Sequence, residues 1–329
     1  MAASDNVSPV TAADGAPTVL TNTTTSSNLV TRAYNLAAAK VYRRNLVWDP
    51  LATVKGTRLS HRGAIVQFNF VNDLDDDPNT AALDENYDVL PTPLESWDTD
   101  VTMGEYGRVV TTTALLRGTS MIPLDPEAAE RVGRNAGAVI DRLAFAAVID
   151  AAGGGVNNDG TPNTSAPTAI TGETSPSDVL RAASQTFKEK DVPTFANGKY
   201  TAVMTPACET ALRKEADAAG WRYWQINQEE RGGSGDITNG MVGAYEGFNI
   251  IVANTPQLDT VGAVFLGAEA LAKAHSTAPG FGANPQVVVS PVVDRLKRFA
   301  SVGWYHLVGY KRYRAEAIMT GDLTTAVAP

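Results

Sequence analysis

The sequence's most conspicuous candidate for a chemical motif is a set of three glycines, Gly240, Gly243 and Gly247, in the stretch GMVGAYEGFNIIVANTP. A dinucleotide-binding fingerprint needs the spacing G-x-G-x-x-G between a strand and a helix, and a P-loop ends in Gly-Lys-Ser/Thr. Here the spacing is G-x-x-G-x-x-x-G, no lysine follows, and the next residues are an apolar run. We therefore interpret the glycines as turns that start a strand over 248–253, and we expect no phosphate site and no cofactor.

A second candidate is an acidic run in which oxygen-bearing side chains alternate from Asp73 to Asn79, as in a calcium-binding loop. Such a loop needs glycine at its sixth position and a bidentate glutamate at its twelfth. Those positions hold Pro78 and Asp84. We interpret the run as a solvated acidic tip, with adventitious cation binding as the alternative, and we assign no metal site.

Groups for acid–base or nucleophilic catalysis are sparse. The three histidines, His61, His275 and His306, are far apart, and neither an H-x-x-x-H nor a G-x-S-x-G motif occurs. The pair Glu229-Glu230 lies in a glycine-flanked loop, where burial is not expected to raise a carboxyl pKa. We interpret the histidines as surface or interface residues and assign no catalytic residue, although a triad that assembles only in the folded chain stays open.

Composition narrows the functional classes further. Lys and Arg total 27 and Asp and Glu 36, so the net charge is 27 − 36 = −9, and no basic run of the kind that grips nucleic acid occurs. Charged residues make up 19% of the chain, below the roughly 25% of typical soluble domains. This deficit indicates either a surface largely covered by neighbouring subunits or an ordinary surface rich in Ala and Thr.

The chain has one cysteine, Cys208, which cannot form an internal disulfide and is expected to be a small buried hydrophobe. The N-terminus has neither a basic start nor an apolar h-region, and no apolar run approaches membrane-spanning length. We expect a soluble protein from a reducing compartment, with no membrane partner.

The first half of the chain reads as a loose arm followed by long, extended elements. Residues 1–28 lack apolar periodicity, and 29–46 form a weakly amphipathic helix. The alternating segment 64–72 predicts a half-buried strand, and 101–116 a second strand region rich in Val and Thr. Between them lie nearly thirty acidic, proline-broken residues, which indicates a hairpin that reaches away from the body.

A long helix is predicted over 125–152, with Asp125 as N-cap, Pro126 at its first position and Gly153-Gly154-Gly155 at its end. Its length of about 40 Å suits a strut. The rest of the chain mixes short elements, which we predict as helices over 177–190 (capped by Ser177) and 206–219, strands over 200–204, 285–291 and 300–319, and a strand followed by a short helix over 263–274. Without regular βαβ alternation, the fold class is α+β.

This order of features resembles the major capsid proteins of tailed bacteriophages, which have the Hong Kong 97 capsid fold. The segments that most resemble the N4-like members of that family are VTMGEYGRVVTTT (101–113), MTPACETALRKE (204–215), GMVGAYEGFNIIVANTP (240–256) and SPVVDRLKRFASVGWYHLVG (290–309). The resemblance covers most of residues 29–320. It implies an N-terminal arm (1–50), an extended loop or E-loop with flanking strands (51–120), a peripheral or P-domain with its spine helix (121–195), an axial or A-domain (196–285) and a C-terminal return to the P-domain (286–329).

The resemblance implies a structural protein, not an enzyme. It would assemble into hexamers and pentamers of an icosahedral head that encloses double-stranded DNA without sequence-specific binding. Its implied partners are a separate scaffolding protein, since the stretch before residue 29 is too short for a scaffolding segment unless one was removed, a portal, and optional decoration proteins. Its place would be the virion, after assembly in the host cytoplasm. The alternatives are an encapsulin-like nanocompartment shell, a soluble enzyme without a recognisable motif, and a tail component.

One contact between subunits follows from charge contrast. The acidic residues Asp75, Asp76 and Asp77 would lie at the tip of the extended loop, and the basic pair Arg43 and Arg44 in the N-terminal arm. We hypothesise that the acidic tip of one subunit meets this basic pair on the next.

Overall fold

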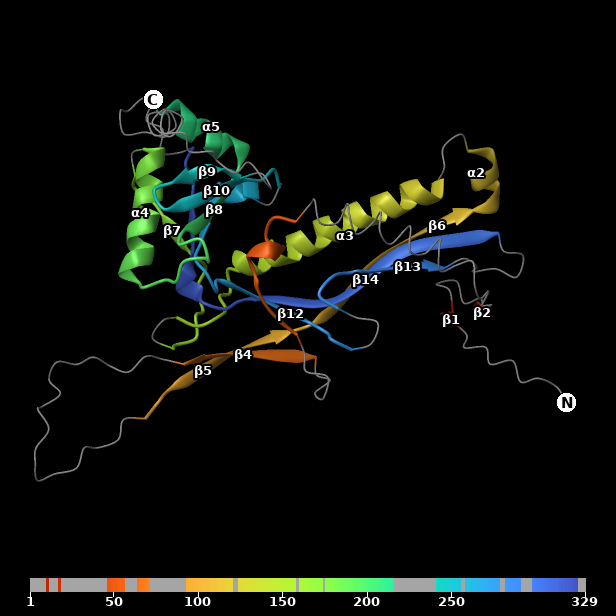
Figure 1. Ribbon diagram of the computed structural model, residues 1–329, viewed down its shortest axis with the longest axis horizontal. Helices are drawn as coiled ribbons and strands as arrows, with labels where there is room; N and C mark the ends of the chain where they lie inside the picture. The colour runs from red at the N-terminus through yellow and green to blue at the C-terminus, as the bar shows by residue number, and fades with distance from the viewer. Residues whose placement is uncertain are drawn as a thin grey trace, which may run out of the picture.

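The structure of the protein is a computed structural model. This structure describes residues 10–11, 17–18, 46–56, 64–71, 93–120, 124–157, 160–173, 175–215, 241–255, 258–278, 282–290 and 298–324. Within these ranges the chain forms an elongated body with a sheet-and-helix unit at one end and a long helix and sheet along its length (Figure 1). Helices and strands are mixed, as the α+β prediction expects.

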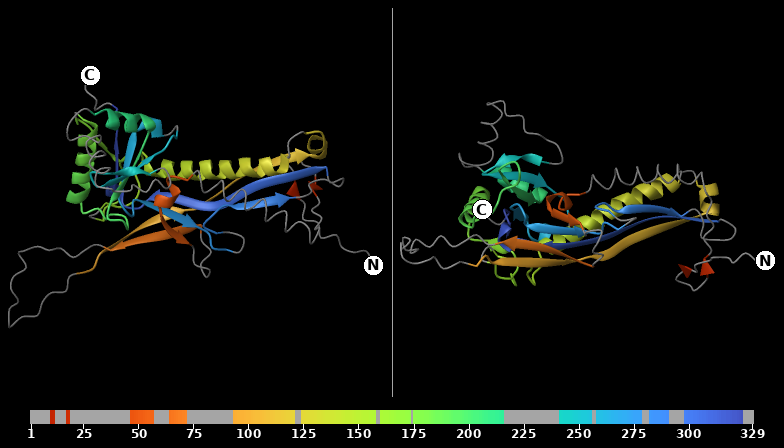
Figure 2. Two further views of the ribbon diagram at one scale, coloured as in Figure 1. Left: turned by 45° about the horizontal axis from the view of Figure 1, so that its top comes forward. Right: turned by 60° about the horizontal axis from the view of Figure 1, so that its bottom comes forward.

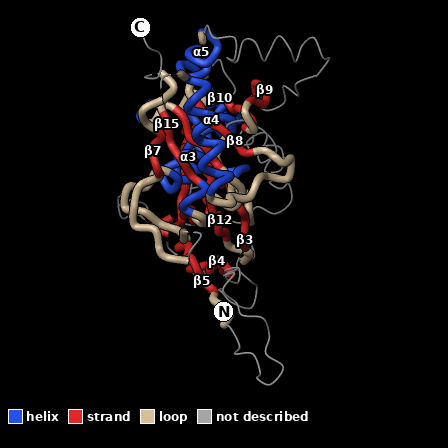
Figure 3. The backbone as a smooth tube through the Cα atoms, turned by 90° about the vertical axis from the view of Figure 1, so that its left-hand side faces the viewer, coloured by secondary structure: helices blue, strands red, loops and turns tan. Residues whose placement is uncertain are grey.

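The unit at one end is built on a six-stranded mixed sheet. Figure 3 shows its strands in red beside helices α4 (Pro176–Glu189) and α5 (Pro206–Lys214), in blue. Its order is β7 (Thr168–Ile170), β15 (Ile318–Gly321), β11 (Ala263–Leu266), β8 (Tyr200–Met204), β10 (Phe248–Val252) and β9 (Met241–Tyr245). The core includes Phe187, Phe248 and Phe265, each fully buried. The sheet thus gathers segments from both halves of the chain around one apolar centre.

The long part of the body is a five-stranded sheet with one helix along it (Figure 2). Its strands are β13 (Gln286–Ser290), β14 (Phe299–Arg312), β12 (Leu271–His275), β3 (Thr53–Gly56) and β6 (Gly104–Thr113), and β6 pairs with β14 over its whole length. The short helix α2 (Ala114–Thr119) follows β6 at the far tip. Smaller pieces are the pair β1 (Val10–Thr11) and β2 (Pro17–Thr18) and the 3-10 turns η1 (Asp49–Leu51), η3 (Leu258–Thr260) and η4 (Ala315–Ala317).

The long helix α3 spans Leu124–Val148, about 38 Å at 1.5 Å per residue. Its apolar stripe packs on the five-stranded sheet, where Ala136 and Ile140 contact a cluster that includes Val302 and Trp304. The predicted helix is therefore confirmed, but its ends differ. Asp125 lies inside the first turn and is not the N-cap, and the helix stops four residues early, before the three glycines that continue the chain with positive φ.

The expected hairpin exists, with a different second strand. Strand β4 (Ile65–Val71) pairs antiparallel with β5 (Ser96–Thr102), most of which falls in the segment predicted to be irregular. The segment predicted as its partner forms β6 instead and pairs with β14. The reason is burial. Thr99 and Val101 are buried against the body and alternate with exposed residues, a strand pattern that the acidic composition of 96–100 hides.

Three smaller predictions need correction. Residues 271–275 form strand β12 and no helix, because they pair with β14 on one side and β3 on the other, and tertiary pairing overrides the helix propensity of an Ala-rich segment. Helix α4 is capped by Ser175, whose hydroxyl accepts from Asp178 N, and not by Ser177. Gly247 does turn the chain between β9 and β10 with φ +85°, whereas Gly243 pairs inside β9 and Gly240 lies outside the described residues.

Candidate functional site

The outer face of the five-stranded sheet, opposite α3, carries an apolar groove of about 500 Å³. Its centre is Gly303 of β14, which is flanked in register by Val109 on β6 and Val288 on β13. Val109 is 62% exposed and Val288 45% exposed. The glycine leaves a trough between two valines that the described part of the chain does not cover, which is typical of a protein–protein contact.

The tip of the body is also apolar. Helix α2 is capped by Thr113 and places Leu115 and Leu116 at 77% and 50% exposure. In the sequence these leucines end the predicted strand region 101–116, and neither is a predicted site residue. The available signal was the pair of large apolar residues between a polar Thr run and Arg117.

A buried carboxylate of α3 holds the segment that leads into the body. Asp141 Oδ1 accepts from Val47 N at 2.8 Å and Trp48 N at 2.7 Å. The Trp48 ring is fully buried and lies 5.0 Å from the Phe145 ring, centroid to centroid. Burial raises the pKa of Asp141 to about 6, while the backbone N–H groups of Trp48 and Val47 lower it. Two chain segments more than 90 residues apart are thus joined at one acid.

A buried ion pair adds a second anchor on the same segment. Lys273 Nζ lies 2.6 Å from Asp49 Oδ1, and the Tyr310 hydroxyl donates to that same oxygen. Lys273 is 3% and Asp49 9% exposed, so both charges are out of water and depend on each other. Together with Asp141, this pair fixes residues 47–49 between α3 and the sheet.

His306 departs from the interpretation of the histidines as surface or interface residues. His306 is 1% exposed, and burial together with the nearby Lys273 lowers its pKa to about 4, so it is neutral at pH 7. The pKa of His275 is lowered by the same two causes. His306 is buried because its position in β14 points toward α3, an orientation that a lone histidine in the sequence does not reveal. His61 lies outside the described residues.

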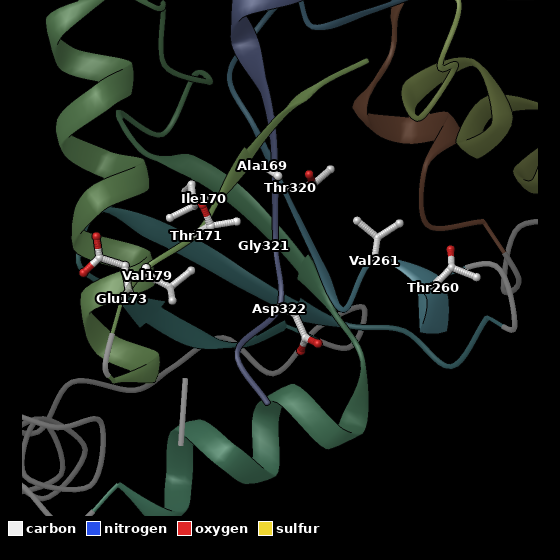
Figure 4. A pocket seen from close by; sticks show the side chains of 11 residues that line it. Ala169, Ile170, Thr171, Glu173, Val179, Thr260, Val261, Thr320, Gly321 and Asp322 are labelled. Carbon is white, nitrogen blue, oxygen red and sulfur yellow. The ribbon is translucent and has the colours of Figure 1, made fainter. Parts of the chain in front are cut away.

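The six-stranded unit has a second cavity, of about 320 Å³, between β7, β15 and η3 (Figure 4). Ile170, Val179 and Val261 form its apolar wall. Its carboxylates are Glu173 and Asp322, and Asp322 accepts from Thr324 N at 2.9 Å and Oγ1 at 2.6 Å. The residues that line it include no histidine, lysine or cysteine.

The predicted contact residues Arg43, Arg44 and Asp75–Asp77 all lie outside the described residues, as do the Glu229-Glu230 pair and the rest of the calcium-like run. Cys208 is fully buried, as predicted. Among the residues that the structure describes, no cluster of three or more His, Cys, Asp or Glu side chains could hold a metal ion. Within the same ranges, no helix combines the length and apolarity that a membrane crossing needs.

Residues 98–319 match the model of the family described as phage capsid protein. This range spans more than half of the 329 residues and includes β6, α3 and the residues that line the apolar groove on the outer face of the five-stranded sheet. Comparison with curated proteins returns no match.

Solved structures with the same fold include the capsid of cyanophage P-SCSP1u, with 12% identity, a TM-score of 0.60, and coverage of 84% of this chain and 87% of that one. The capsid of Ralstonia phage GP4 aligns with 17% identity and a TM-score of 0.60 over 84% and 87%. A virus-like particle from Pyrococcus furiosus aligns with 11% identity and a TM-score of 0.53 over 89% and 99%. At these identities the likeness shows a shared fold.

Proposed function

The chain belongs to the phage capsid protein family, and from this premise we propose how it builds a shell. It is a structural major capsid protein of a phage head with the Hong Kong 97-like fold, and the members of its family are shell components, not enzymes. It acts in the virion as part of an oligomeric capsid. We propose that the oligomers are hexamers and pentamers in an icosahedral head.

The observation that carries this proposal is an elongated subunit whose exposed apolar positions lie away from its cores. Leu115 and Leu116 project at the tip, and Val109 and Val288 line the outer groove. A shell needs contacts that close into rings, and each subunit then offers different patches to its neighbours. The tip and the groove provide two such patches on one body.

The arrangement of the elements supports an assignment of the parts of the subunit to domains. We propose that α3 with the five-stranded sheet is the P-domain and its spine, that β4 and β5 are the root of the E-loop, and that the six-stranded sheet is the A-domain. Sheet membership favours adding α4, β7 and β15 to the expected A-domain segment 196–285, and β12 to the P-domain. Residues 1–50 would be the N-terminal arm, with its root at Asp49.

We propose double-stranded DNA as the content of the head, held without sequence-specific contacts. The net charge of −9 favours this, because a strongly acidic subunit repels a polyanion and does not trap it. A separate scaffolding protein, a portal and optional decoration proteins complete the proposed set of partners, and host cytoplasm is the proposed place of assembly.

The experiment that tests this function is negative-stain electron microscopy of the purified protein, expressed alone and together with its scaffolding protein, backed by sedimentation. Closed shells, or rings of six and five subunits, are expected. A discrete monomer or dimer under both conditions would contradict the proposal. Nucleic acid inside particles from infected cells supports the phage head, whereas an enclosed protein cargo would favour the nanocompartment alternative.

The charge contact between Asp75–Asp77 and the pair Arg43 and Arg44 remains a proposal about neighbouring subunits. Reversal of Asp75, Asp76 and Asp77 to lysine is expected to reduce the yield of shells, and a second reversal of Arg43 and Arg44 to glutamate is expected to restore it. Exposed pairs contribute under about 1 kcal/mol each, so the effect depends on repetition around the shell. Unchanged assembly of the first variant would rule the contact out.

A further inference from the structure

The face of the β4–β5 hairpin that meets the body ends at an aromatic pair. Three cross-strand pairs point inward, namely Val66 with Val101, Phe68 with Thr99, and Phe70 with Trp97. The first two pairs are buried, whereas Phe70 and Trp97 are half-buried. The Phe70–Trp97 pair is therefore the last inward-facing pair that the structure describes before the tip segment 72–92.

Trp97 rests directly on the backbone of Gly160. Gly160 has φ +81°, and a Cβ added to it would lie 1.9 Å from Trp97 Nε1. No real Cβ contact is that short, so the indole occupies the space that any side chain at 160 would need. Among the described residues the buried Trp97 Nε1 has no hydrogen-bond partner, which makes this a packing contact.

The other ring of the pair is held by a cation. The guanidinium carbon of Arg314 lies 4.5 Å from the centre of the Phe70 ring, and Arg314 Nε lies 3.5 Å from Glu269 Oε2. Such cation–π contacts favour one position of the ring. Both rings of the outermost described pair are thus fixed from the side of the body.

The loop that carries Gly160 is tied to the segment that carries Arg314. Val156 N donates to Tyr313 O at 2.9 Å, and Ala315 N donates to Val156 O at 3.0 Å. Gly160 N donates to Asn157 O at 3.0 Å, and Asn157 is cross-linked to Thr161 by two further hydrogen bonds. Gly160 and Arg314 therefore lie on hydrogen-bonded segments that together contact the hairpin.

The remaining polar contacts of the hairpin root with the body leave its direction less defined. Tyr313 donates its hydroxyl to Asn69 O at 2.7 Å, Lys311 Nζ donates to Asp100 O at 3.2 Å, and Lys55 Nζ donates to Gln67 O at 2.5 Å. These are single, long side chains that reach main-chain carbonyls, and they follow the strands through small rotations. An atom inserted between Trp97 and Gly160 cannot be accommodated by small rotations, because the Gly160 backbone and the indole are already in contact.

We propose that Trp97 and Gly160 form a latch that sets the angle at which the β4–β5 hairpin leaves the body, and that this angle selects the size and regularity of the shell. The inference rests on the proposed function, since it requires the hairpin to reach a neighbouring subunit. Trp97 and Gly160 are positioning residues, and they act through the part of the hairpin that makes the contact between subunits.

The test is Gly160→Ala, compared with Gly198→Ala as the matched control. Gly198 has a similar φ of +71°, but nothing lies within 4 Å of a Cβ added there. Both variants bear the backbone strain of alanine at positive φ, and only Gly160→Ala drives a methyl group into Trp97. We expect Gly160→Ala to lower the yield of shells of wild-type diameter several-fold or to broaden the diameters, whereas Gly198→Ala assembles normally.

Rescue separates a latch from a general folding defect. Trp97→Leu removes the indole and makes room for the methyl group, so the double variant Gly160→Ala with Trp97→Leu is expected to form regular shells more efficiently than either single variant. Hydrogen exchange of unassembled subunits is expected to be faster in β4 and β5 for each single variant, with α3 unchanged. This readout also applies to Trp97→Leu alone if Gly160→Ala does not fold.

Two results would overturn the latch. The first is assembly of Gly160→Ala with the yield and diameters of Gly198→Ala. The second is a double variant that is worse than both single variants, because independent defects add and compensating ones do not. Failure of the wild-type protein to form shells would instead contradict the proposed function, so the two failures are distinguishable.

Discussion

At the scale of single residues, two buried groups respond to acid in opposite directions. Burial raises the pKa of Asp141 from 3.8 to about 6, so its stabilising contribution is fully present below pH 3.8 and is lost as the pH rises through 6. Burial lowers the pKa of His306 from 6.5 to about 4, so its contribution is present above pH 6.5 and is lost as the pH falls through 4. Between pH 7 and 4 the two effects offset each other.

We predict that removal of either group reveals the pH dependence of stability that the other group causes. Asp141→Asn is expected to lose about 3 kcal/mol of unfolding free energy between pH 7 and pH 4. Over this range His306 takes up a proton in the unfolded chain and stays largely neutral in the folded one. His306→Gln is expected to gain a similar amount over the same range. Urea unfolding of unassembled subunits at a series of pH values measures both slopes. Parallel pH profiles for the two variants would contradict the opposition.

At the scale of elements, the strut helix depends on its contact with the sheet. Ile140 is fully buried in the cluster with Val302 and Trp304, whereas its neighbour Val139 is only partly buried. We expect Ile140→Ala to cost about 2–5 kcal/mol of unfolding free energy through the cavity it leaves, and Val139→Ala to cost clearly less. Urea midpoints of the two variants compare the sites, and equal losses would show that α3 is not held through this stripe.

Helix α2 is expected to behave in the opposite way. Leu115 and Leu116 bury little in the subunit, so the double change Leu115→Ser with Leu116→Ser should alter its stability by no more than about 0.5 kcal/mol. Assembly should fall, since these leucines are the apolar surface of the tip. Sedimentation of assembly reactions measures the yield, and Lys199→Ser, a change at another exposed position, is the control. Normal shells from the leucine variant would remove the tip from the set of contacts.

At the scale of the whole molecule, the extended segment is expected to serve assembly and not folding. Val71 and Ser96 are paired across the hairpin, so residues 72–95 can be replaced by an Asn-Gly turn that joins the two strands directly. The cores lie elsewhere, and the shortened subunit should unfold at the same urea concentration as the full chain. Electron microscopy should then show no closed shells. A shortened chain that still forms regular shells would show that the tip is dispensable.

Much of the fold could be predicted from the sequence where one periodicity dominates. The apolar stripe of α3 predicts a helix, and the alternation of Val66 and Phe68 in β4 predicts a strand, because one face of each element is buried and the other is not. The glycine turn at Gly247 was readable for a related reason, since an isolated glycine before an apolar strand has few other uses. The capsid fold was implied by the resemblance of this order of elements, and of the four quoted segments, to the phage capsid family.

Tertiary contacts alone decided which strands pair and what their side chains face. Residues 96–100 read as acidic and irregular, yet they form most of β5, the partner of β4. Residues 271–274 read as helix, yet they belong to β12 and pair with a strand on each side. The burial of His306 and the contact of Gly160 with Trp97 likewise depend on segments far apart in the chain. Local propensities are worth fractions of a kcal/mol per residue, whereas pairing and burial are worth more. The sequence by itself therefore determined the elements and the class of protein, and the packed chain determined the anchors, the groove and the direction of the hairpin.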